Sequence, residues 1–161
     1  MKPENFGKWT AKTKLFDELD FDKIQMRITT DRYTAPEFQE REREQIWMKV
    51  WQIVGRADEL PAAGDWKEYR LFDQSYLIAR GADGQLRGFV NSCRHRGNKL
   101  CEGKGNAKKF TCPYHIWTYG LDGRLNSFAR PDLVGPIDKD EHGLLQVPVD
   151  TFAGFIFLNP D

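Results

Sequence analysis

The sequence predicts a mainly β fold, an antiparallel sandwich or barrel preceded by one N-terminal helix. Three observations support this prediction. Short runs rich in β-branched and aromatic residues follow residue 51, turn signals separate these runs, and a helical pattern precedes them. The chain of 161 residues is long enough for one domain with a substantial core.

Residues 1–33 are predicted to be a polar arm, and residues 34–51 are predicted to be the helix. Thr34 and Glu37 have the spacing of a capping box, and Pro36 lies in the first turn, where a missing N–H costs little. Four apolar residues can share one face of this helix: Phe38, Ile46, Trp47 and Val50. The charged run 40–44 is predicted to be a solvated face with local ion pairs.

Residues 52–161 are predicted to be the β domain. The expected strands lie in "WQIVG", "WKEYRLF", "SYLIAR", "LRGFVNS", "HGLLQVPV" and "GFIFLN". The expected turns lie in "PAAGD", "FDQS", "GADGQ" and "LDGR". The segment 91–123 interrupts this pattern, so we expect it to form loops that the β framework holds.

Composition excludes several classes of protein. The net charge is zero, which gives no global field for nucleic acid or for a membrane surface. No apolar run approaches the ~20 residues that span a bilayer, and the N-terminus lacks the apolar stretch of a signal peptide. Three cysteines are too few for a disulfide scaffold. We therefore expect a cytoplasmic protein that binds neither nucleic acid nor membrane.

Two cysteine–histidine pairs, Cys93-x-His95 and Cys112-x-x-His115, are the candidate functional residues. Thiolate and neutral imidazole are preferred ligands of zinc and of iron–sulfur clusters. Chance is a poor explanation, because two of the three histidines lie within three residues of two of the three cysteines. Zinc remains a competitor, although structural zinc sites usually pair cysteine with cysteine and histidine with histidine.

A Rieske [2Fe–2S] centre fits the order of these residues better, since two histidines there replace two cysteines on one iron. Cys93 and Cys112 would hold one iron, and His95 and His115 would hold the other. Two ferric ions, two sulfides and two thiolates carry no net charge, whereas a cluster with four thiolates carries two negative charges. The neutral cluster accepts an electron more easily.

The segments "CRHRGNKL" and "CPYHIWTYGLDGRL" resemble the Rieske domain of aromatic-ring-hydroxylating oxygenase α subunits, the Rieske non-haem iron oxygenases. The resemblance covers about residues 30–161 and includes "VWQIVGRADELPAAGDW" and "GFIFLNP". It implies a Rieske-type antiparallel β-sandwich with an inserted cluster-binding subdomain, whose ligand loops are residues 93–97 and 112–117. Ile116 departs from the family pattern, which usually has Gly or Ala at this position.

The resemblance also implies a shell around the cluster, formed by Arg96, Gly97, Tyr114 and Trp117. Respiratory Rieske proteins usually have one more cysteine in each loop, and the two form a disulfide. Tyr114 stands where the second of these cysteines would be, which leaves Cys101 as an idle thiol. Without that disulfide we expect a reduction potential near the low end of the Rieske range, about −150 mV.

The first ligand loop and its continuation are basic. Residues 94–109 contain a single acid, Glu102. The basic residues there are Arg94, Arg96, Lys99, Lys104, Lys108 and Lys109. This segment is either a solvated loop or a docking face for an acidic electron donor or for the rest of an oxygenase.

The resemblance further implies a mononuclear Fe(II) site held by two histidines and a carboxylate. With three histidines, two of them assigned to the cluster, this chain cannot supply that site. We therefore expect no catalytic residue here and a catalytic domain that is absent from the chain, so its status as an enzyme by itself stays open. No nicotinamide-binding or flavin-binding motif is present.

Two functions fit these observations. The first is the electron-transfer domain of an aromatic-ring-hydroxylating dioxygenase, which passes electrons from a ferredoxin or flavin reductase to a mononuclear iron. Its other partners would be the catalytic oxygenase domain or neighbouring subunits, reached through His115 and a bridging carboxylate. The second is a stand-alone Rieske ferredoxin. The N-terminal helix favours the first function, because free carriers usually start close to the first strand.

Overall fold

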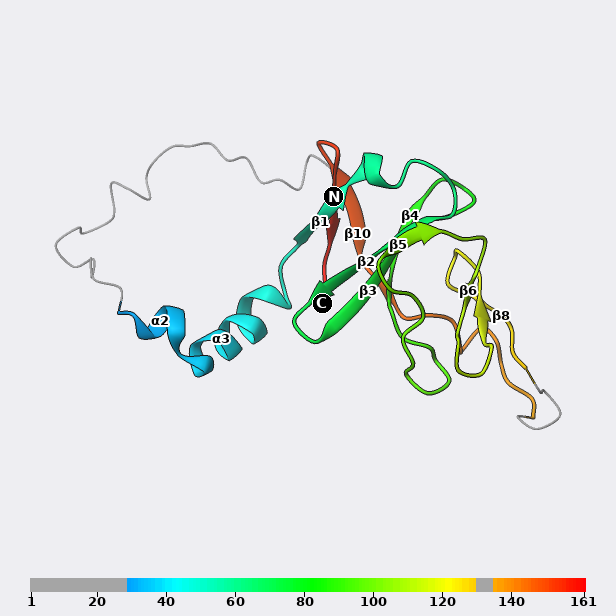
Figure 1. Cartoon of the computed structure of the whole chain (residues 1–161), viewed down its shortest axis with the longest axis horizontal. Helices are drawn as coiled ribbons and strands as arrows, with labels where there is room; N and C mark the ends of the chain where they lie inside the picture. The colour runs from blue at the N-terminus through cyan, green and yellow to red at the C-terminus, as the bar shows by residue number, and fades with distance from the viewer. Residues whose placement is uncertain (1–28, 130–134) are drawn as a thin grey trace. The chain divides into compact units, whose positions relative to one another are not determined.

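The computed structural model describes residues 29–129 and 135–161, and the chain divides into two compact units, residues 1–49 and 50–161 (Figure 1). Most of the predicted arm over residues 1–33 lies outside the described residues. None of the helices in the described ranges has the length and apolar content that a bilayer crossing requires.

Among its described residues, 29–49, the first unit has three short helical elements, α2 (Asp31–Thr34), α3 (Pro36–Glu42) and the π-helical turn η2 (Arg43–Trp47). In η2 the Met48 N–H donates to the Arg43 carbonyl at 3.0 Å. Helix therefore occupies part of the predicted range 34–51. No residue of these three elements is buried; Phe38 is half-buried, and Ile46 and Trp47 are 47% and 42% exposed.

The predicted capping box is wrong. Thr34 belongs to α2, where its hydroxyl donates to the Thr30 carbonyl at 3.1 Å. Ala35 precedes α3 and makes no side-chain cap. The cause is Pro36, whose ring disfavours a helical conformation at the preceding residue and so separates the two helices at Ala35. Pro36 itself lies in the first turn of α3, as predicted.

The second unit is made of antiparallel strands in three sheets (Figure 1). The largest sheet has the order β5-β2-β3-β4-β9, the second β1-β11-β10, and the smallest β6-β7-β8. The strands are β1 (Gln52–Arg56), β2 (Asp65–Leu71), β3 (Gln74–Arg80), β4 (Leu86–Val90), β5 (Lys104–Asn106), β6 (Phe110–Thr111), β7 (Thr118–Tyr119), β8 (Leu125–Ser127), β9 (Gln146–Val147), β10 (Val149–Phe152) and β11 (Phe155–Leu158). The prediction of a mainly β, antiparallel fold is confirmed.

The predicted run 142–149 is divided at Pro148. β9 pairs with β4 in the largest sheet, whereas β10 pairs with β11 in the second sheet. Proline has no N–H to continue a ladder, and here the Pro148 carbonyl accepts a hydrogen bond from the Asn159 N–H at 3.0 Å. The chain therefore changes sheets at Pro148.

Strand β3 is buried on both faces, because successive side chains of a strand point to opposite sides. Tyr76 and Ile78 pack in one cluster with residues of the β1-β11-β10 sheet. Leu77 and Ala79 pack in a second cluster, which also contains both cysteines of the sequence pairs. The segment between β4 and β9 carries these cysteines and the smallest sheet, and so forms the predicted inserted subdomain.

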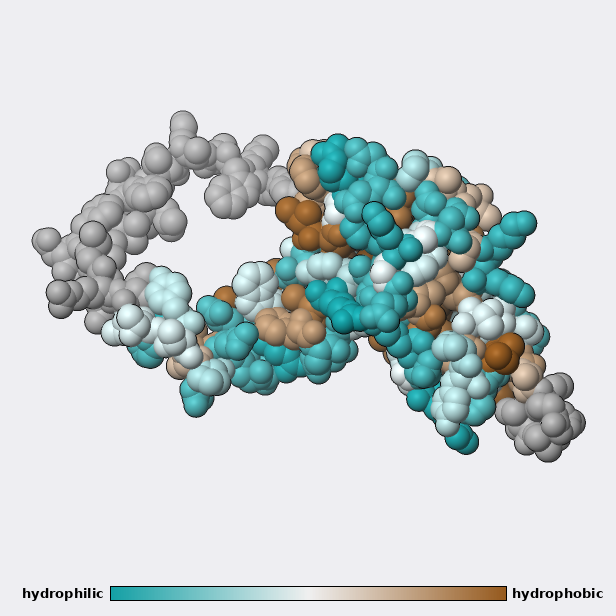
Figure 2. All heavy atoms as spheres, in the orientation of Figure 1, coloured by the Kyte–Doolittle hydropathy of each residue, from teal (hydrophilic) through white to brown (hydrophobic). Residues whose placement is uncertain are grey.

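The outer face of the β1-β11-β10 sheet exposes large apolar side chains, among them Ile53, Phe152 and Phe155. Figure 2 shows hydrophobic surface over this sheet within a largely hydrophilic exterior. Scattered apolar residues on a surface are ordinary, and the largest clusters of apolar side chains lie inside the unit.

A buried carboxylate ties the largest sheet to the segment that follows the first ligand loop. The side chain of Glu68 in β2 is 6% exposed and accepts hydrogen bonds or ion pairs from four groups. They are Arg70 Nε at 2.8 Å, Ser75 Oγ at 2.8 Å, Lys99 Nζ at 2.6 Å and the Gly103 N–H at 3.1 Å. Burial alone would raise the pKa of Glu68, but these donors together lower it from 4.5 to about 2.

We expect Glu68→Gln to destabilise the protein by on the order of 2 kcal/mol at neutral pH. The folded-state pKa of Glu68 lies below its unfolded value, so its contribution is complete above about pH 4.5 and is lost as the pH falls towards about 2. Urea denaturation of both proteins between pH 3 and pH 7 measures this. A difference in unfolding free energy that does not shrink at low pH would contradict the charged role of Glu68.

Candidate metal centre

The two ligand loops are built on the same backbone pattern. The first loop follows β4, and the second connects β6 to β7. In the first, the Cys93 N–H donates to the Asn98 carbonyl at 2.8 Å, and the Gly97 N–H donates to the Cys93 carbonyl at 2.9 Å. In the second, the Cys112 N–H donates to the Trp117 carbonyl at 2.8 Å, and the Ile116 N–H donates to the Cys112 carbonyl at 3.0 Å. Each loop thus closes on its own cysteine.

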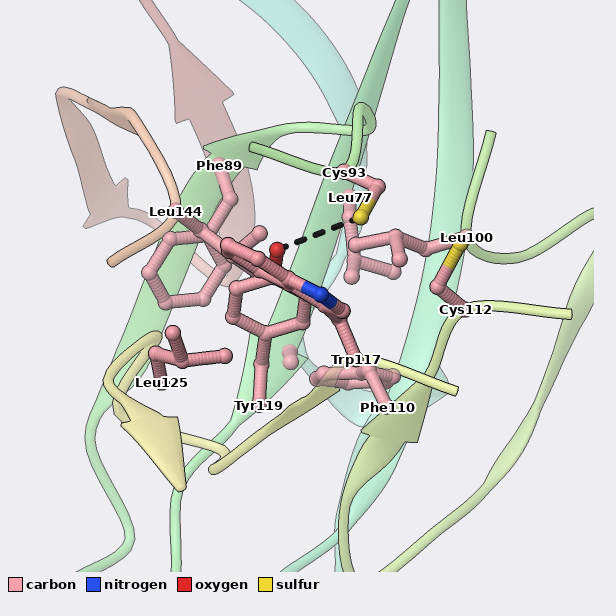
Figure 3. Close-up of a cluster of buried hydrophobic side chains, with 11 residues drawn as sticks. Leu77, Phe89, Cys93, Leu100, Phe110, Cys112, Trp117, Tyr119, Leu125 and Leu144 are labelled. Atoms are coloured by element: carbon pink, nitrogen blue, oxygen red, sulfur yellow. Dashed lines mark hydrogen bonds between the residues drawn. The ribbon is translucent and has the colours of Figure 1, made fainter. Parts of the chain in front are cut away.

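Both cysteines are buried at the edge of the core, each with 2% exposed surface (Figure 3). Burial raises the pKa of the Cys93 thiol, the Tyr119 hydroxyl opposes this effect, and the neighbouring Cys112 thiol adds to it. The Cys93 thiol therefore resists ionisation unless a cation compensates the charge. A metal would supply that compensation, since binding a metal displaces the thiol protons.

The two histidines lie beside each other, with ring centroids 4.7 Å apart. The Nδ1 atoms of His95 and His115 are buried and have no hydrogen-bond partner in the described structure. A buried polar atom without a partner costs free energy, so this pair fits the binding of a metal. Burial, His115 and Arg96 together lower the pKa of His95, which favours the neutral imidazole that binds metals.

The donor set fits a two-iron cluster better than a single zinc ion. Within residues 29–129 and 135–161, no three His, Cys, Asp or Glu side chains are placed to hold one metal ion. A structural zinc site needs four ligands on one ion. A Rieske cluster needs only two protein ligands on each iron, a pair of thiolates and a pair of imidazoles. The residues present therefore fit the Rieske cluster.

All four predicted shell residues lie in contact with or next to the predicted ligand residues. The Trp117 ring stacks on His95 at 4.9 Å between centroids and with 7° between planes, and it is buried. The Tyr114 ring lies 3.8 Å from the His115 ring. Gly97 has a φ of 70° at the end of the first turn. Arg96 is exposed and acts on His95 through its charge.

Sequence reasoning missed Tyr119. Its hydroxyl lies 3.3 Å from Cys93 Sγ (Figure 3) and accepts a hydrogen bond from the Arg94 N–H at 3.0 Å. The tyrosine is fully buried, and both burial and the bond to Cys93 raise its pKa. The Tyr119 proton is therefore available to the sulfur when Cys93 is a thiolate. No local pattern predicts a contact between residues so far apart in the sequence.

Asn91 was also missed. Its side chain is buried, and its Oδ1 atom accepts from the Leu100 and Cys101 N–H groups, both at 3.2 Å. Its Nδ2 atom donates to the Cys101 carbonyl at 2.8 Å and to Ser75 Oγ at 3.0 Å. Asn91 therefore fixes the far end of the first ligand loop to the sheet.

The Cys101 thiol packs against the core, and two charged residues of the basic segment form ion pairs. Burial, with a smaller contribution from Glu68, raises the pKa of Cys101 to about 11, so this thiol stays protonated at neutral pH. Lys99 pairs with Glu68, and Glu102 pairs with Arg70 at 2.8 Å. Arg94 and Arg96 stay exposed beside His95.

Ile116 occupies a backbone conformation that L-residues disfavour. Its φ is 58°, and it stands at the position of the second turn that Gly97 occupies in the first. We expect Ile116→Gly to raise the free energy of unfolding by on the order of 1 kcal/mol, since relief of the left-handed strain exceeds the added entropy of the unfolded chain. Denaturant unfolding of the protein measures this, and destabilisation would contradict the assignment of strain.

The chain is similar to proteins that carry a Rieske [2Fe-2S] domain. The family model described as Rieske [2Fe-2S] domain matches residues 50–138, more than half of the chain. The chain is 39% identical over 130 residues to the carnitine monooxygenase oxygenase subunit of Acinetobacter baumannii, covering 80% of this chain and 35% of that protein. It is 43% identical over 117 residues to the glycine betaine monooxygenase oxygenase subunit of Pseudomonas aeruginosa, covering 72% and 27%.

A solved structure confirms the Rieske-type fold. It is a quaternary ammonium Rieske monooxygenase, described as giving insights into carnitine oxidation by gut microbiota and inter-subunit electron transfer. The TM-score is 0.77 at 38% identity, and the match covers 82% of this chain and 36% of that chain. The chain thus spans about a third of the length of these relatives. From the family model and these matches together, we conclude that the chain belongs to the Rieske [2Fe-2S] domain family and that its relatives include Rieske oxygenase subunits.

Proposed function

We propose that Cys93, His95, Cys112 and His115 hold the Rieske [2Fe–2S] cluster and that the chain is the electron-transfer domain of an oxygenase. The observation that carries this proposal is the meeting of two buried thiols with two buried, unpartnered Nδ1 atoms in matched loops. When bound, such a cluster stores and releases one electron at a time.

The residues around the proposed ligands have two roles, the exclusion of water and the stabilisation of charge on sulfur. Trp117 stacks on His95, and the buried Leu100, Phe110 and Leu125 belong to the cluster of side chains that contains both thiols, so water is excluded from the sulfur side. With Cys93 as a thiolate ligand, the Tyr119 hydroxyl 3.3 Å away would donate to Cys93 Sγ and stabilise negative charge on that sulfur. The histidine rings are only partly buried. Electrons would therefore leave and enter on the histidine side.

An oxygenase domain is better supported than a free ferredoxin. The match to the carnitine monooxygenase subunit covers 130 residues, more than the 112 that run from Val50 to Asp161. It therefore extends into the helical unit, which the Rieske family model does not reach. The donor would be a ferredoxin or flavin reductase, and the acceptor a mononuclear iron in a catalytic domain or in a neighbouring subunit.

The substrate of the whole oxygenase is proposed to be a quaternary ammonium compound, in place of the aromatic compound that the sequence resemblance implied. Carnitine and glycine betaine monooxygenase subunits are among the relatives, and the similar solved structure is a quaternary ammonium monooxygenase. Oxygen uptake by the complete oxygenase with its reductase tests this. We expect uptake with carnitine or glycine betaine, and uptake with naphthalene alone would overturn the proposal.

The ligand assignment predicts different results for the three cysteines. Cys93→Ser or Cys112→Ser should reduce the iron and sulfide content from about two of each per chain to near zero, because each thiolate holds the same iron. Cys101→Ser is the matched control and should keep both. Metal analysis and the visible absorption spectrum measure this. A colourless Cys101→Ser protein, or wild type that carries one zinc, would refute the assignment.

Tyr119→Phe should lower the reduction potential by about 20–60 mV, the equivalent of one hydrogen bond of roughly 0.5–1.5 kcal/mol for a one-electron couple. The hydroxyl of Tyr119 stabilises charge on Cys93 Sγ, and that charge increases on reduction. Protein-film voltammetry measures the shift. Iron content equal to that of wild type is the control, and an unchanged potential would show that the 3.3 Å contact does not tune the sulfur.

A further inference from the structure

His142 is the third histidine of the chain, and it lies in the segment that leads into β9. This segment is attached to the β7–β8 hairpin on both sides of His142. The Leu144 N–H donates to the Gly123 carbonyl at 2.8 Å. On the other side, Lys139 Nζ donates to the Asn126 carbonyl, also at 2.8 Å. The backbone that carries His142 is therefore held against the hairpin that follows the second ligand loop.

The imidazole ring of His142 is restrained by the turn that precedes it. Its Nδ1 atom lies 2.7 Å from the Asp138 carbonyl oxygen, and the His142 N–H donates to the Lys139 carbonyl at 3.3 Å. A carbonyl oxygen only accepts hydrogen bonds, so Nδ1 carries a proton and donates it. The residue is half-buried. The direction of the ring is thus set by hydrogen bonds, and the ring does not rotate freely in solvent.

This direction places the imidazole against Trp117. The two ring centroids are 5.8 Å apart, with 63° between the planes, an edge-to-face arrangement that aromatic pairs prefer. Trp117 is 2% exposed and belongs to the buried cluster of Figure 3. It stacks in turn on His95, with 4.9 Å between centroids, and Phe128 also contacts the indole, at 5.7 Å. Three rings therefore form a continuous series from His142 through a buried tryptophan to a proposed ligand.

Ring contacts orient the His95 side chain. Histidines that bind a metal usually donate their other ring N–H to a carboxylate, a carbonyl or a water, which fixes the direction of the ring. Within residues 29–129 and 135–161, no protein group forms a hydrogen bond with the His95 ring. The restraints that the structure shows are the contacts with Trp117 and His115. The position of the indole therefore matters more for His95 than it would for a ligand held by a hydrogen bond.

We propose that His142 is a positioning residue for the cluster, because its ring holds the indole of Trp117 flat on His95. This inference rests on the proposed function, in which His95 is a ligand. Without the imidazole of His142, one edge of the indole would be open to water, and the indole could tilt away from His95. The His95 ring would then be less restricted and more hydrated. His142 thus acts on the cluster through Trp117 and makes no contact with iron.

The test uses three variants of the 161-residue chain with its cluster. His142→Ala removes the ring, and His142→Phe keeps an aromatic ring without its nitrogens. Lys139→Ala is the matched control, since it removes the other attachment of the same segment, the bond to the Asn126 carbonyl, and leaves all three rings in place. Two quantities are measured, the rate at which the reduced protein loses iron to bathophenanthroline and the electron paramagnetic resonance spectrum of the reduced cluster.

We expect His142→Ala to lose iron roughly threefold faster or more, below the effect of about 10–100-fold on metal affinity that direct partners of ligands have. Its g-values should change, because they depend on the orientation of the imidazole ligands. His142→Phe should restore the spectrum and the rate of wild type within about twofold, and Lys139→Ala should match wild type.

Three results would overturn the inference. They are a His142→Ala protein with the spectrum and rate of wild type, a Lys139→Ala protein that loses iron as fast as His142→Ala, and a His142→Phe protein that behaves like His142→Ala. The second would show that the segment acts by general tightening, and the third that the imidazole acts by its charge or its nitrogens. Wild-type protein without two irons and two sulfides per chain would instead contradict the proposed function, and this content is measured first.

Discussion

The structure depends on holding two thiols and two imidazoles together at the edge of a hydrophobic core, without hydrogen-bond partners for the imidazole Nδ1 atoms. Elsewhere in the described chain, the buried side chains that carry polar atoms find partners, and only the Nδ1 atoms of His95 and His115 do not. Such an arrangement is unfavourable unless a ligand completes it. The rest of the unit can be understood as the framework that keeps these four groups in place.

That framework acts from two sides. On one side, strand β3 contributes Leu77 and Ala79 to the cluster of side chains that contains Cys93 and Cys112. It can do so because its alternate residues, Tyr76 and Ile78, are covered by the β1-β11-β10 sheet. On the other side, the side chains of Asn91 and Glu68 accept hydrogen bonds from backbone N–H groups of residues 100–103. Apolar burial thus positions the cysteines, and a small number of satisfied polar groups fixes where the first loop ends.

The two loops solve one geometric problem with different residues. Each closes a turn on its cysteine and ends at a residue of positive φ, but one uses Gly97 and the other uses Ile116. Glycine avoids the strain at the cost of a more flexible unfolded chain. Ile116 has a strained backbone with a φ of 58°, and its apolar side chain lies beside His115. The difference between the loops lies on the surface beside the half-buried histidines.

Residue types and local spacing were enough to propose the ligand set and to predict most of the β framework. Residue type and spacing define Cys93, His95, Cys112 and His115, because metal chemistry admits few donors and the pairs are local. Alternation and turn residues likewise indicate the long strands, since both signals act within a few residues.

Three features depend on the tertiary structure alone. They are the contact of Tyr119 with Cys93, the hydrogen bonds of Asn91 to residues 100–101, and the change of sheet at Pro148. The two- and three-residue strands β5 to β8 also escaped prediction, since such short segments carry no periodicity. The capping box failed for a local reason, because Pro36 separates the two helices at Ala35 and the Thr34 hydroxyl bonds to the Thr30 carbonyl within α2. For Tyr119, Asn91 and Pro148, the partner of each group is set by packing between distant segments, and a local pattern contains no information about it.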